Sequence, residues 1–302
     1  MRCGWQGRAI CVSVIGGIVA GALLSARAPV RADEPQVEFR ENVEYGSGGG
    51  QPLTLHLARP AGLSGPVPAI AFIHGGGWRA GSKDAHIEDI KKTAAQGYVA
   101  VSVGYRFAPE HRFPAQIEDC KCAIRWLRAH AGELSIDPER IGAIGFSAGA
   151  HLSMLLGTMD SADGLEGEGG WADQSSKVQA VVAYFGPTDF NAEYPALSRP
   201  LVEAFLGGTR DEVPEAYRAA SPLTYVSTGD APILILQGTN DVLVPYTQAI
   251  SMVSALADAK VPGRIEMMLG AGHGWGGTEM ERTRQATADF FDQYLGHREA
   301  AP

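Results

Sequence analysis

The stretch from Arg140 to Leu152, RIGAIGFSAGAHL, constrains the fold more than any other part of the chain. A short apolar run ends in Gly145-Phe146-Ser147-Ala148-Gly149, and residues 148–156 continue with a helical pattern. Small residues flank Ser147, as a sharp turn from a strand into a helix requires, because such a turn leaves no room for side chains. The pattern G-x-S-x-G also occurs by chance or as an ordinary turn, so its meaning depends on partner residues elsewhere in the chain.

The N-terminal segment has the features of a secretory signal. Arg2 and Arg8 precede an apolar run from Ala9 to Leu24, and Val30-Arg31-Ala32 is a small-residue cleavage pattern. We therefore expect a signal peptide over residues 1–32 and a secreted or periplasmic protein. The alternative is an uncleaved anchor, although the run is shorter than the ~20 residues of a spanning helix. After signal removal we expect no stable membrane insertion.

The composition is that of a globular enzyme-sized domain. The chain has 302 residues, of which 45% are hydrophobic and 20% charged, so residues 33–302 are expected to form a single domain. Residues 1–32 contain four arginines and no acid, so their removal lowers the net charge from −9 to −13. This acidic balance argues against nucleic acid as a partner. Cys120 and Cys122 are two apart in a helix, which predicts neither a disulfide nor a zinc site.

Apolar runs alternate with helical patterns along the chain. The alternation predicts a mostly parallel central sheet flanked by helices, with a hairpin first. The expected strands are 37–45, 53–59, 67–73, 98–105, 141–144, 178–185, 231–236 and 264–269, and the expected helices are about 85–96, 114–127, 148–156, 245–257 and a last one ending at Tyr294. Residues 186–230 break this rhythm, and we interpret them as a small helical, cap-like insertion after the sixth strand.

Two polar stretches are interpreted as surface. In the helix from Pro114, the apolar stripe leaves Asp119, Lys121, Arg125 and Arg128 for the solvent side. Residues 158–177 are rich in Gly, Asp and Glu but lack a D-x-D-x-D-G pattern, so a surface loop is favoured over a calcium site.

Three candidate catalytic residues follow three predicted strands. Ser147, Asp241 and His273 each come directly after a strand, and the carboxyl ends of parallel strands meet at one edge of the sheet. A serine hydroxyl is a weak nucleophile, so it needs a base and a group that orients the base. We expect His273 to be the base and Asp241 to orient it. Asp189, which also follows a strand, is an alternative acid or a helix cap.

A glycine loop follows the strand over residues 67–73. Its sequence is His74-Gly75-Gly76-Gly77-Trp78, and glycines in this place let backbone N–H groups face a cavity. We expect the N–H groups of Gly76, Gly77 and Ala148 to bind an oxyanion, where one donor is typically worth ~3 kcal/mol. His74 and Trp78 are expected to support this loop, and His151 is expected to pack beneath it. The alternative is a plain glycine turn with Trp78 in the core.

Together these motifs resemble a known superfamily. HGGGW, YRFAPEHRFPAQIED, GFSAGAHL, GTNDVLVP and GAGHGW resemble α/β-hydrolase esterases and lipases. The resemblance is to the branch around bifunctional feruloyl and acetyl-xylan esterases, with hormone-sensitive-lipase-type esterases nearby, and it runs from about Leu53 to the C terminus. Two positions depart from the pattern: Ala150 replaces a usual second glycine, and Phe146 replaces the acid of the lipase-type branch.

The resemblance implies an α/β-hydrolase fold and a secreted serine carboxylesterase. The expected reaction is cleavage of short acyl or aryl esters through a Ser147 acyl-enzyme, with no metal and no cofactor. The expected substrate is a small-molecule or polysaccharide ester, such as an acetyl or feruloyl ester of plant polysaccharide. An amide-cleaving enzyme of the same fold, such as an arylformamidase or peptidase, and a non-catalytic binding protein remain alternatives. The oligomeric state is not indicated by the sequence.

Overall fold

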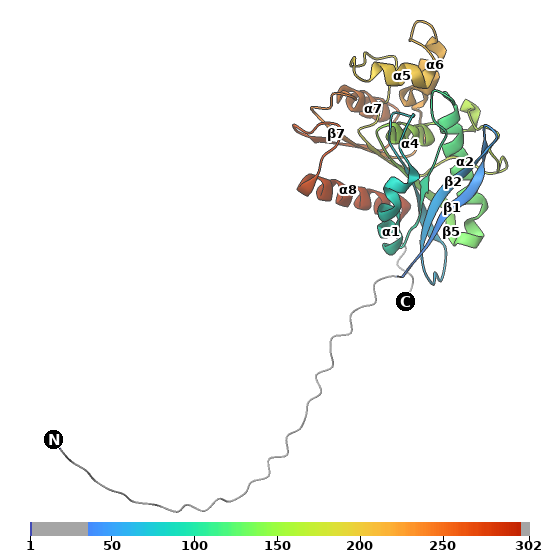
Figure 1. Ribbon diagram of the computed structural model, residues 1–302, viewed down its shortest axis with the longest axis vertical. Coiled ribbons are helices and arrows are strands. Elements are labelled where there is room, and N and C mark those ends of the chain that lie inside the picture. Colours follow the sequence, from blue (N-terminus) through green and yellow to red (C-terminus); the bar gives the residue numbers. More distant parts are fainter. Residues whose placement is uncertain (2–35, 297–302) are drawn as a thin grey trace, which may run out of the picture. The chain divides into compact units, whose positions relative to one another are not determined.

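A central sheet organises the described part of the chain (Figure 1). It has eight strands in the order β1-β2-β4-β3-β5-β6-β7-β8. The strands are β1 (Val37–Gly48), β2 (Gln51–Pro60), β3 (Val67–Ile73), β4 (Val99–Val103), β5 (Ile136–Phe146), β6 (Ala180–Tyr184), β7 (Ile233–Gly238) and β8 (Gly263–Met268). The β1–β2 and β2–β4 pairs are antiparallel and the other pairs are parallel. The predicted mostly parallel sheet with an N-terminal hairpin is therefore confirmed.

This computed structural model describes Met1 and residues 36–296. The predicted signal peptide, residues 1–32, lies outside the described residues except for Met1. None of the helices that are described combines the length and apolar character needed to cross a bilayer.

Helices cover both faces of the sheet. They are α1 (Ile87–Ala95), α2 (Ala115–Ala129), α3 (Ala131–Leu134), α4 (Ala148–Thr158), α5 (Arg199–Leu206), α6 (Pro214–Ala220), α7 (Thr247–Asp258) and α8 (Gly277–Leu295), with short 3₁₀ turns η1 (Lys83–His86), η2 (Ser161–Asp163) and η3 (Pro222–Tyr225). The segment predicted as a helical insertion after the sixth strand contains α5, α6 and η3. Helices α5 and α6 lie side by side at one end of the folded unit (Figure 1), and η3 contacts α6.

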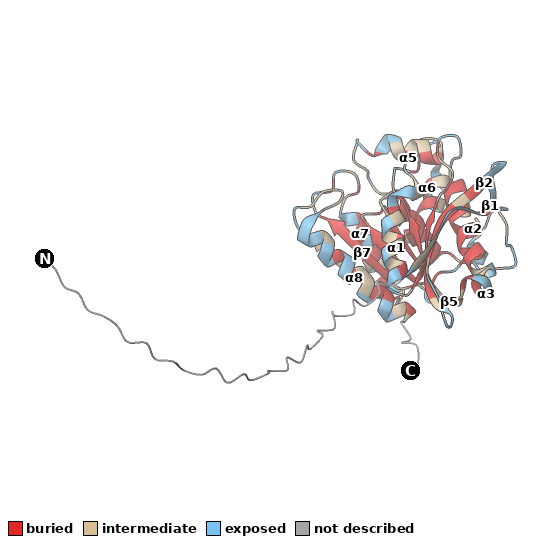
Figure 2. Cartoon of the chain, turned by 60° about the horizontal axis from the view of Figure 1, so that its bottom comes forward, coloured by how far each residue is buried: buried red, intermediate tan, exposed pale blue. Residues whose placement is uncertain are grey.

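Alternation along the strands divides the core into two layers. In β3, Ala69, Ala71 and Ile73 belong to the core cluster that contains residues of α2, α4 and α7, whereas Ile70 and Phe72 belong to the cluster that contains residues of α1 and α8. This follows from the pleat, because successive side chains of a strand point to opposite faces. Strands covered on both faces are apolar throughout, and Figure 2 shows the buried residues concentrated in the sheet.

The prediction that four polar residues of α2 face solvent is wrong for three of them. Asp119, Lys121 and Arg125 are each 1% exposed. Arg106 donates to both carboxylate oxygens of Asp119, through Nε at 3.0 Å and Nη2 at 2.7 Å. Lys121 Nζ and Arg125 Nη1 lie 2.9 and 2.7 Å from the two oxygens of Glu166.

These residues are buried because two other segments of the chain fold over α2. Arg106 belongs to the loop before α2, and Glu166 belongs to the acidic segment 158–177, so two distant segments supply the opposite charges. A buried charge is tolerated when it is paired and hydrogen-bonded, as these are. Within residues 36–296, no three His, Cys, Asp or Glu side chains are grouped as a metal site requires.

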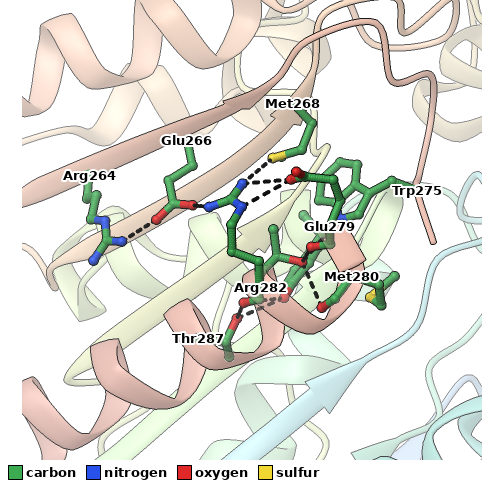
Figure 3. Close-up of polar contacts among 10 residues, drawn as sticks. Arg264, Glu266, Met268, Trp275, Glu279, Met280, Arg282 and Thr287 are labelled. Atoms are coloured by element: carbon green, nitrogen blue, oxygen red, sulfur yellow. Dashed lines mark hydrogen bonds and ion pairs between the residues drawn. The ribbon is translucent and has the colours of Figure 1, made fainter. Parts of the chain in front are cut away.

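The N-terminal part of α8 is joined to the edge strand β8 by a polar network (Figure 3). The guanidinium of Arg282 contacts Glu266 of β8 and donates to Glu279 at 3.0 and 3.1 Å. Trp275 Nε1 donates to Thr283 Oγ1 at 3.0 Å. These contacts hold both ends of residues 270–276, the segment between β8 and α8 that contains His273.

Candidate active site

Ser147 lies at the turn between β5 and α4 in a backbone conformation that L residues rarely adopt. Its φ and ψ are 54° and −117°. A Cβ at Gly145 would overlap the Gly149 carbonyl oxygen, and a Cβ at Gly149 would overlap that of Ile73. Both glycines are therefore required by close backbone approach. The strained turn lifts the serine side chain out of the sheet edge, as in a nucleophile elbow.

Ser147, His273 and Asp241 form one hydrogen-bonded chain. Ser147 Oγ lies 2.8 Å from His273 Nε2, and His273 Nδ1 lies 2.7 Å from Asp241 Oδ2. Because a carboxylate only accepts, Nδ1 carries the proton and Nε2 is left to accept from the serine hydroxyl. The sheet thus brings together the three residues that the sequence placed after β5, β7 and β8.

The Asp241 carboxylate is bonded at both oxygens. Its side chain is fully buried. Oδ1 accepts the N–H groups of Leu243 and Val244, both at 2.9 Å, and Oδ2 accepts from Gln237 Nε2 at 3.1 Å as well as from His273. Burial raises the pKa of Asp241, but these hydrogen bonds outweigh it and hold the pKa below its ordinary value. The group is therefore an anion at neutral pH.

The glycine loop lies directly against the serine turn. A Cβ at Gly75 would meet the Phe146 carbonyl oxygen at 2.8 Å and Ser147 Cβ at 3.3 Å. Gly76 and Gly77 have φ values of 119° and 58°, which favour glycine. Ala148 is the first residue of α4, so its N–H has no acceptor within the helix. Gly76 and Gly77 line the pocket at Ser147, and Ala148 follows Ser147 directly in the chain.

His74 sits behind the glycine loop. Its Nδ1 donates to the Gly75 carbonyl at 2.7 Å, and its ring stacks on Tyr105 at 4.3 Å. The Tyr105 hydroxyl donates to the His74 carbonyl at 2.9 Å. Burial lowers the pKa of His74 to about 4. A neutral His74 thus bonds the backbone of the loop whose shape it was predicted to hold.

Trp78 and His151 connect the glycine loop to the insertion. Trp78 Nε1 donates to His151 Nδ1 at 3.1 Å, and the Trp78 ring stacks on Phe205 of α5 at 4.3 Å. His151 Nε2 then donates to the Ala220 carbonyl of α6 at 2.7 Å. Burial lowers the pKa of His151 to about 4, so it is neutral. His151 packs beneath the loop, as predicted.

The alternative acid Asp189 is engaged elsewhere. Its Oδ1 accepts the N–H of Asn191 at 2.9 Å, and its own N–H donates to Gln248 Oε1 at 2.8 Å. Asp189 therefore closes its own turn. Among the described residues, the carboxylate bonded to His273 is that of Asp241.

Phe146 occupies an aromatic environment. Its ring stacks on His86 at 4.8 Å and on Tyr184 at 4.7 Å. Phe146 thus packs among aromatic rings at the position where the lipase-type branch has an acid.

The methyl group of Ala150 faces Gly186, which has no side chain. A Cβ at Gly186 would lie 2.6 Å from Ala150 Cβ, so the absence of a side chain at Gly186 provides the space for the Ala150 methyl group. The departure from the usual glycine is thus compensated across the α4–insertion contact.

A pocket of about 390 Å³ opens at Ser147. The glycine loop lines part of it, and segments after β6, β7 and β8 line other parts. The insertion contributes Tyr194, Ser198, Leu201 and Val202. Most of the lining is apolar, so the pocket suits an apolar group next to the serine.

Gln237 and Tyr194 are site residues that sequence reasoning missed. Gln237 is the one polar side chain in the buried run ILILQ of β7, and this break in an apolar strand was the available signal. Tyr194 gave no comparable signal, because spacing does not show which insertion residues reach the pocket.

Comparisons with known proteins agree with this geometry. The BD-FAE family model matches residues 55–256. Esterase LipC of Mycobacterium tuberculosis (strain ATCC 25618 / H37Rv) is 32% identical over 311 residues, which cover 97% of this chain and 76% of LipC. Other mycobacterial relatives are matched over about half of their own length.

Solved structures of esterases share the fold. A truncated form of a carbohydrate esterase from gut microbiota has a TM-score of 0.77 and 28% identity, covering 88% of this chain and 99% of that one. The propionate-bound esterase Est2 of Thermogutta terrifontis has a TM-score of 0.70 and 25% identity, covering 89% and 97%.

Proposed function

Since the chain belongs to the BD-FAE family of α/β-hydrolase esterases and is a carboxylic ester hydrolase, we propose that it cleaves short acyl or aryl esters through a covalent intermediate on Ser147. The observation that carries this proposal is the hydrogen-bonded chain from Ser147 through His273 to Asp241, which opens into an apolar pocket.

In the first half-reaction, His273 Nε2 takes the proton of the Ser147 hydroxyl while Oγ attacks the ester carbonyl carbon. The carbonyl oxygen becomes an anion, and the N–H groups of Gly76, Gly77 and Ala148 stabilise it. His273 then donates its proton to the alcohol oxygen as the C–O bond breaks, so the alcohol leaves and the acyl group remains on Ser147.

In the second half-reaction, water repeats the attack on the acyl-enzyme. His273 takes a proton from the water as its oxygen attacks the acyl carbon. It returns this proton to Ser147 Oγ as the bond between Oγ and the acyl carbon breaks, which releases the carboxylic acid and restores the serine hydroxyl. Asp241 stays ionised throughout, because its bonded environment holds its pKa low, and it stabilises the imidazolium. His74 and Trp78 maintain the glycine loop and take no part in proton transfer.

For the substrate, we propose esters with a short acyl or aryl group, including acetyl or feruloyl esters of plant polysaccharide. The apolar pocket of about 390 Å³ favours such groups over charged ones. A carbohydrate esterase and a propionate-bound esterase among the structural relatives support the same classes. The names of these relatives favour esters over amides.

We also propose export of the protein after cleavage near residue 32. The support is the charged, apolar and small-residue order of residues 1–32. Sequencing the N terminus of the mature protein tests this directly, because a mature chain that still begins at Met1 contradicts it.

The catalytic proposal is tested with Ser147→Ala on p-nitrophenyl acetate. We expect kcat to fall by about 10⁴-fold or more, while the variant keeps the unfolding midpoint of the parent protein within a few degrees. Activity retained in the purified variant would refute the assignment of Ser147.

A further inference from the structure

Tyr194 carries a buried hydroxyl that has no protein partner. Its Oη is inaccessible to solvent, and no group within residues 36–296 accepts or donates a hydrogen bond to it. The ring is held in place by stacking on Phe190, with centroids 5.7 Å apart and planes at 20°. Burial, with a smaller effect of the Asp189 charge, raises the pKa of Tyr194 well above its ordinary value. The hydroxyl is therefore protonated and able to donate.

The other insertion tyrosines differ from Tyr194 in this respect. Tyr217 Oη donates to the Gly208 carbonyl at 3.2 Å, and Tyr225 Oη donates to the Ala219 carbonyl at 2.8 Å. Buried hydroxyls are normally paired in this way, because an unpaired one destabilises the folded state. Tyr194 is also the one of these three tyrosines that lines the pocket at Ser147, so we consider a ligand bound in this pocket as the partner of its hydroxyl.

Tyr194 also lies where two pockets meet. Together with Val202, it lines both the pocket at Ser147 and an adjoining pocket of about 360 Å³. The first has a mostly apolar lining. The second is lined by the charged residues Glu193, Arg199, Glu203, Arg210 and Asp211. An ester that extends from Ser147 past Tyr194 would thus pass from apolar into polar surroundings.

We propose that Tyr194 is a specificity-determining residue that donates a hydrogen bond to an oxygen of the alcohol part of the ester, and that the charged pocket accommodates a polyhydroxylated alcohol such as a sugar. This inference rests on the proposed esterase chemistry at Ser147. A short acyl group needs no polar partners and suits the mostly apolar pocket, whereas a sugar requires hydrogen-bonding groups, which the charged residues of the second pocket supply. A site built to bond a substrate oxygen discriminates against analogues that lack it.

The test compares Tyr194→Phe with the parent protein on two acetates. Ethyl acetate has no further oxygen on its alcohol, and a mono-O-acetyl methyl xyloside has several. We expect kcat/KM for the sugar acetate to fall by about tenfold, equivalent to about 1.4 kcal/mol, while kcat/KM for ethyl acetate stays within about twofold. An equal loss on both substrates, or no loss on either, would overturn the proposal.

Tyr217→Phe is the matched control. It removes a hydroxyl from the same charged pocket, but one that has a protein partner, so the ratio of the two kcat/KM values should stay unchanged. The pair methyl ferulate and methyl cinnamate probes the acyl side, and a loss by Tyr194→Phe confined to methyl ferulate would overturn the assignment to the alcohol.

Stability gives an independent measurement. Because the hydroxyl lacks a protein partner, Tyr194→Phe should leave the thermal unfolding midpoint unchanged or raise it, and a fall of several degrees would contradict the proposal. Failure of the esterase proposal is distinguishable, because it would appear as activity retained in Ser147→Ala.

Discussion

Gln237 Nε2 lies 3.1 Å from Asp241 Oδ2, the same oxygen that accepts the hydrogen bond from His273 Nδ1. The amide also donates to the Val244 carbonyl at 3.0 Å, and Gln237 is fully buried. The end of β7 is thereby bonded to the loop that carries Asp241. We therefore propose that Gln237 is a positioning residue, which acts on the imidazole through the Asp241 carboxylate.

Replacing Gln237 with Met removes this donor with little change in volume. Hydrogen bonds to charged groups contribute about 1.5–3 kcal/mol, so we expect kcat for p-nitrophenyl acetate to fall about tenfold or more with KM nearly unchanged. Gln248→Met is the control, because this buried glutamine bonds Thr188 and Asp189 instead. It should lower stability and leave kcat within about twofold. Equal losses of kcat in both variants would contradict the assigned role.

The loss of folding stability at acidic pH should depend in part on His151. Its pKa is lowered to about 4 by burial, from an ordinary value of 6.5, so its neutral form stabilises the fold above pH 6.5. This contribution is lost as the pH falls from 6.5 through 4, and it amounts to about 3 kcal/mol by pH 4. His151→Gln keeps an acceptor for Trp78 and a donor for Ala220 but does not titrate.

Urea unfolding at pH 7.5, 5.5 and 4.5 tests this expectation. The parent protein should lose more stability between the highest and lowest pH than His151→Gln does. Parallel losses in the two proteins would show that His151 is not a source of the acid sensitivity. His74, with a pKa also lowered to about 4 by burial, should contribute in the same direction in both proteins.

The Ala150–Gly186 contact predicts a non-additive pair of substitutions. In Gly186→Ala the new methyl group would lie 2.6 Å from Ala150 Cβ, and we expect a loss of about 1–3 kcal/mol from overpacking. Adding Ala150→Gly should restore part of this loss, because it removes the opposing methyl group. Chemical unfolding of both single variants and the double variant gives the coupling energy. Additive effects would contradict the proposed compensation.

The free energy of unfolding should depend on Glu166, which neutralises the buried cations of α2. Glu166→Gln leaves Lys121 and Arg125 buried without their counter-charge, and we expect the free energy of unfolding to fall by about 3 kcal/mol. Glu215→Gln is the matched control, because its pair with Arg218 is exposed and worth about 0–1 kcal/mol. Denaturant unfolding of the two variants measures the difference. Similar small losses would mean that the α2 cations do not require Glu166.

The strands and the order of the site residues were predictable because their signals are local. Apolar runs bounded by glycine or proline locate β3 and β7 within about two residues, and parallel strands bring their carboxyl ends to one edge of the sheet. Ser147, Asp241 and His273 each follow such a strand. Their meeting is therefore a consequence of the sheet order.

The features that escaped prediction depend on contacts between distant segments. Asp119 and Arg125 read as solvent-facing on their own helix, and only the loops that carry Arg106 and Glu166 show that they are buried. The unpaired hydroxyl of Tyr194 likewise appears only when the insertion is packed over the serine. Sequence spacing carries no information on such partners.

The most direct test of the account is to locate the nucleophile by mass spectrometry. The protein would be inactivated with paraoxon, which phosphorylates an activated serine, and then digested into peptides. We predict one diethylphosphoryl group on the peptide that contains Ser147. The rate of labelling should fall by about 10³-fold or more in His273→Ala, and Ser147→Ala should carry no label. Full inactivation with the label on another residue, or labelling of Ser147 that does not depend on His273, would contradict the mechanism.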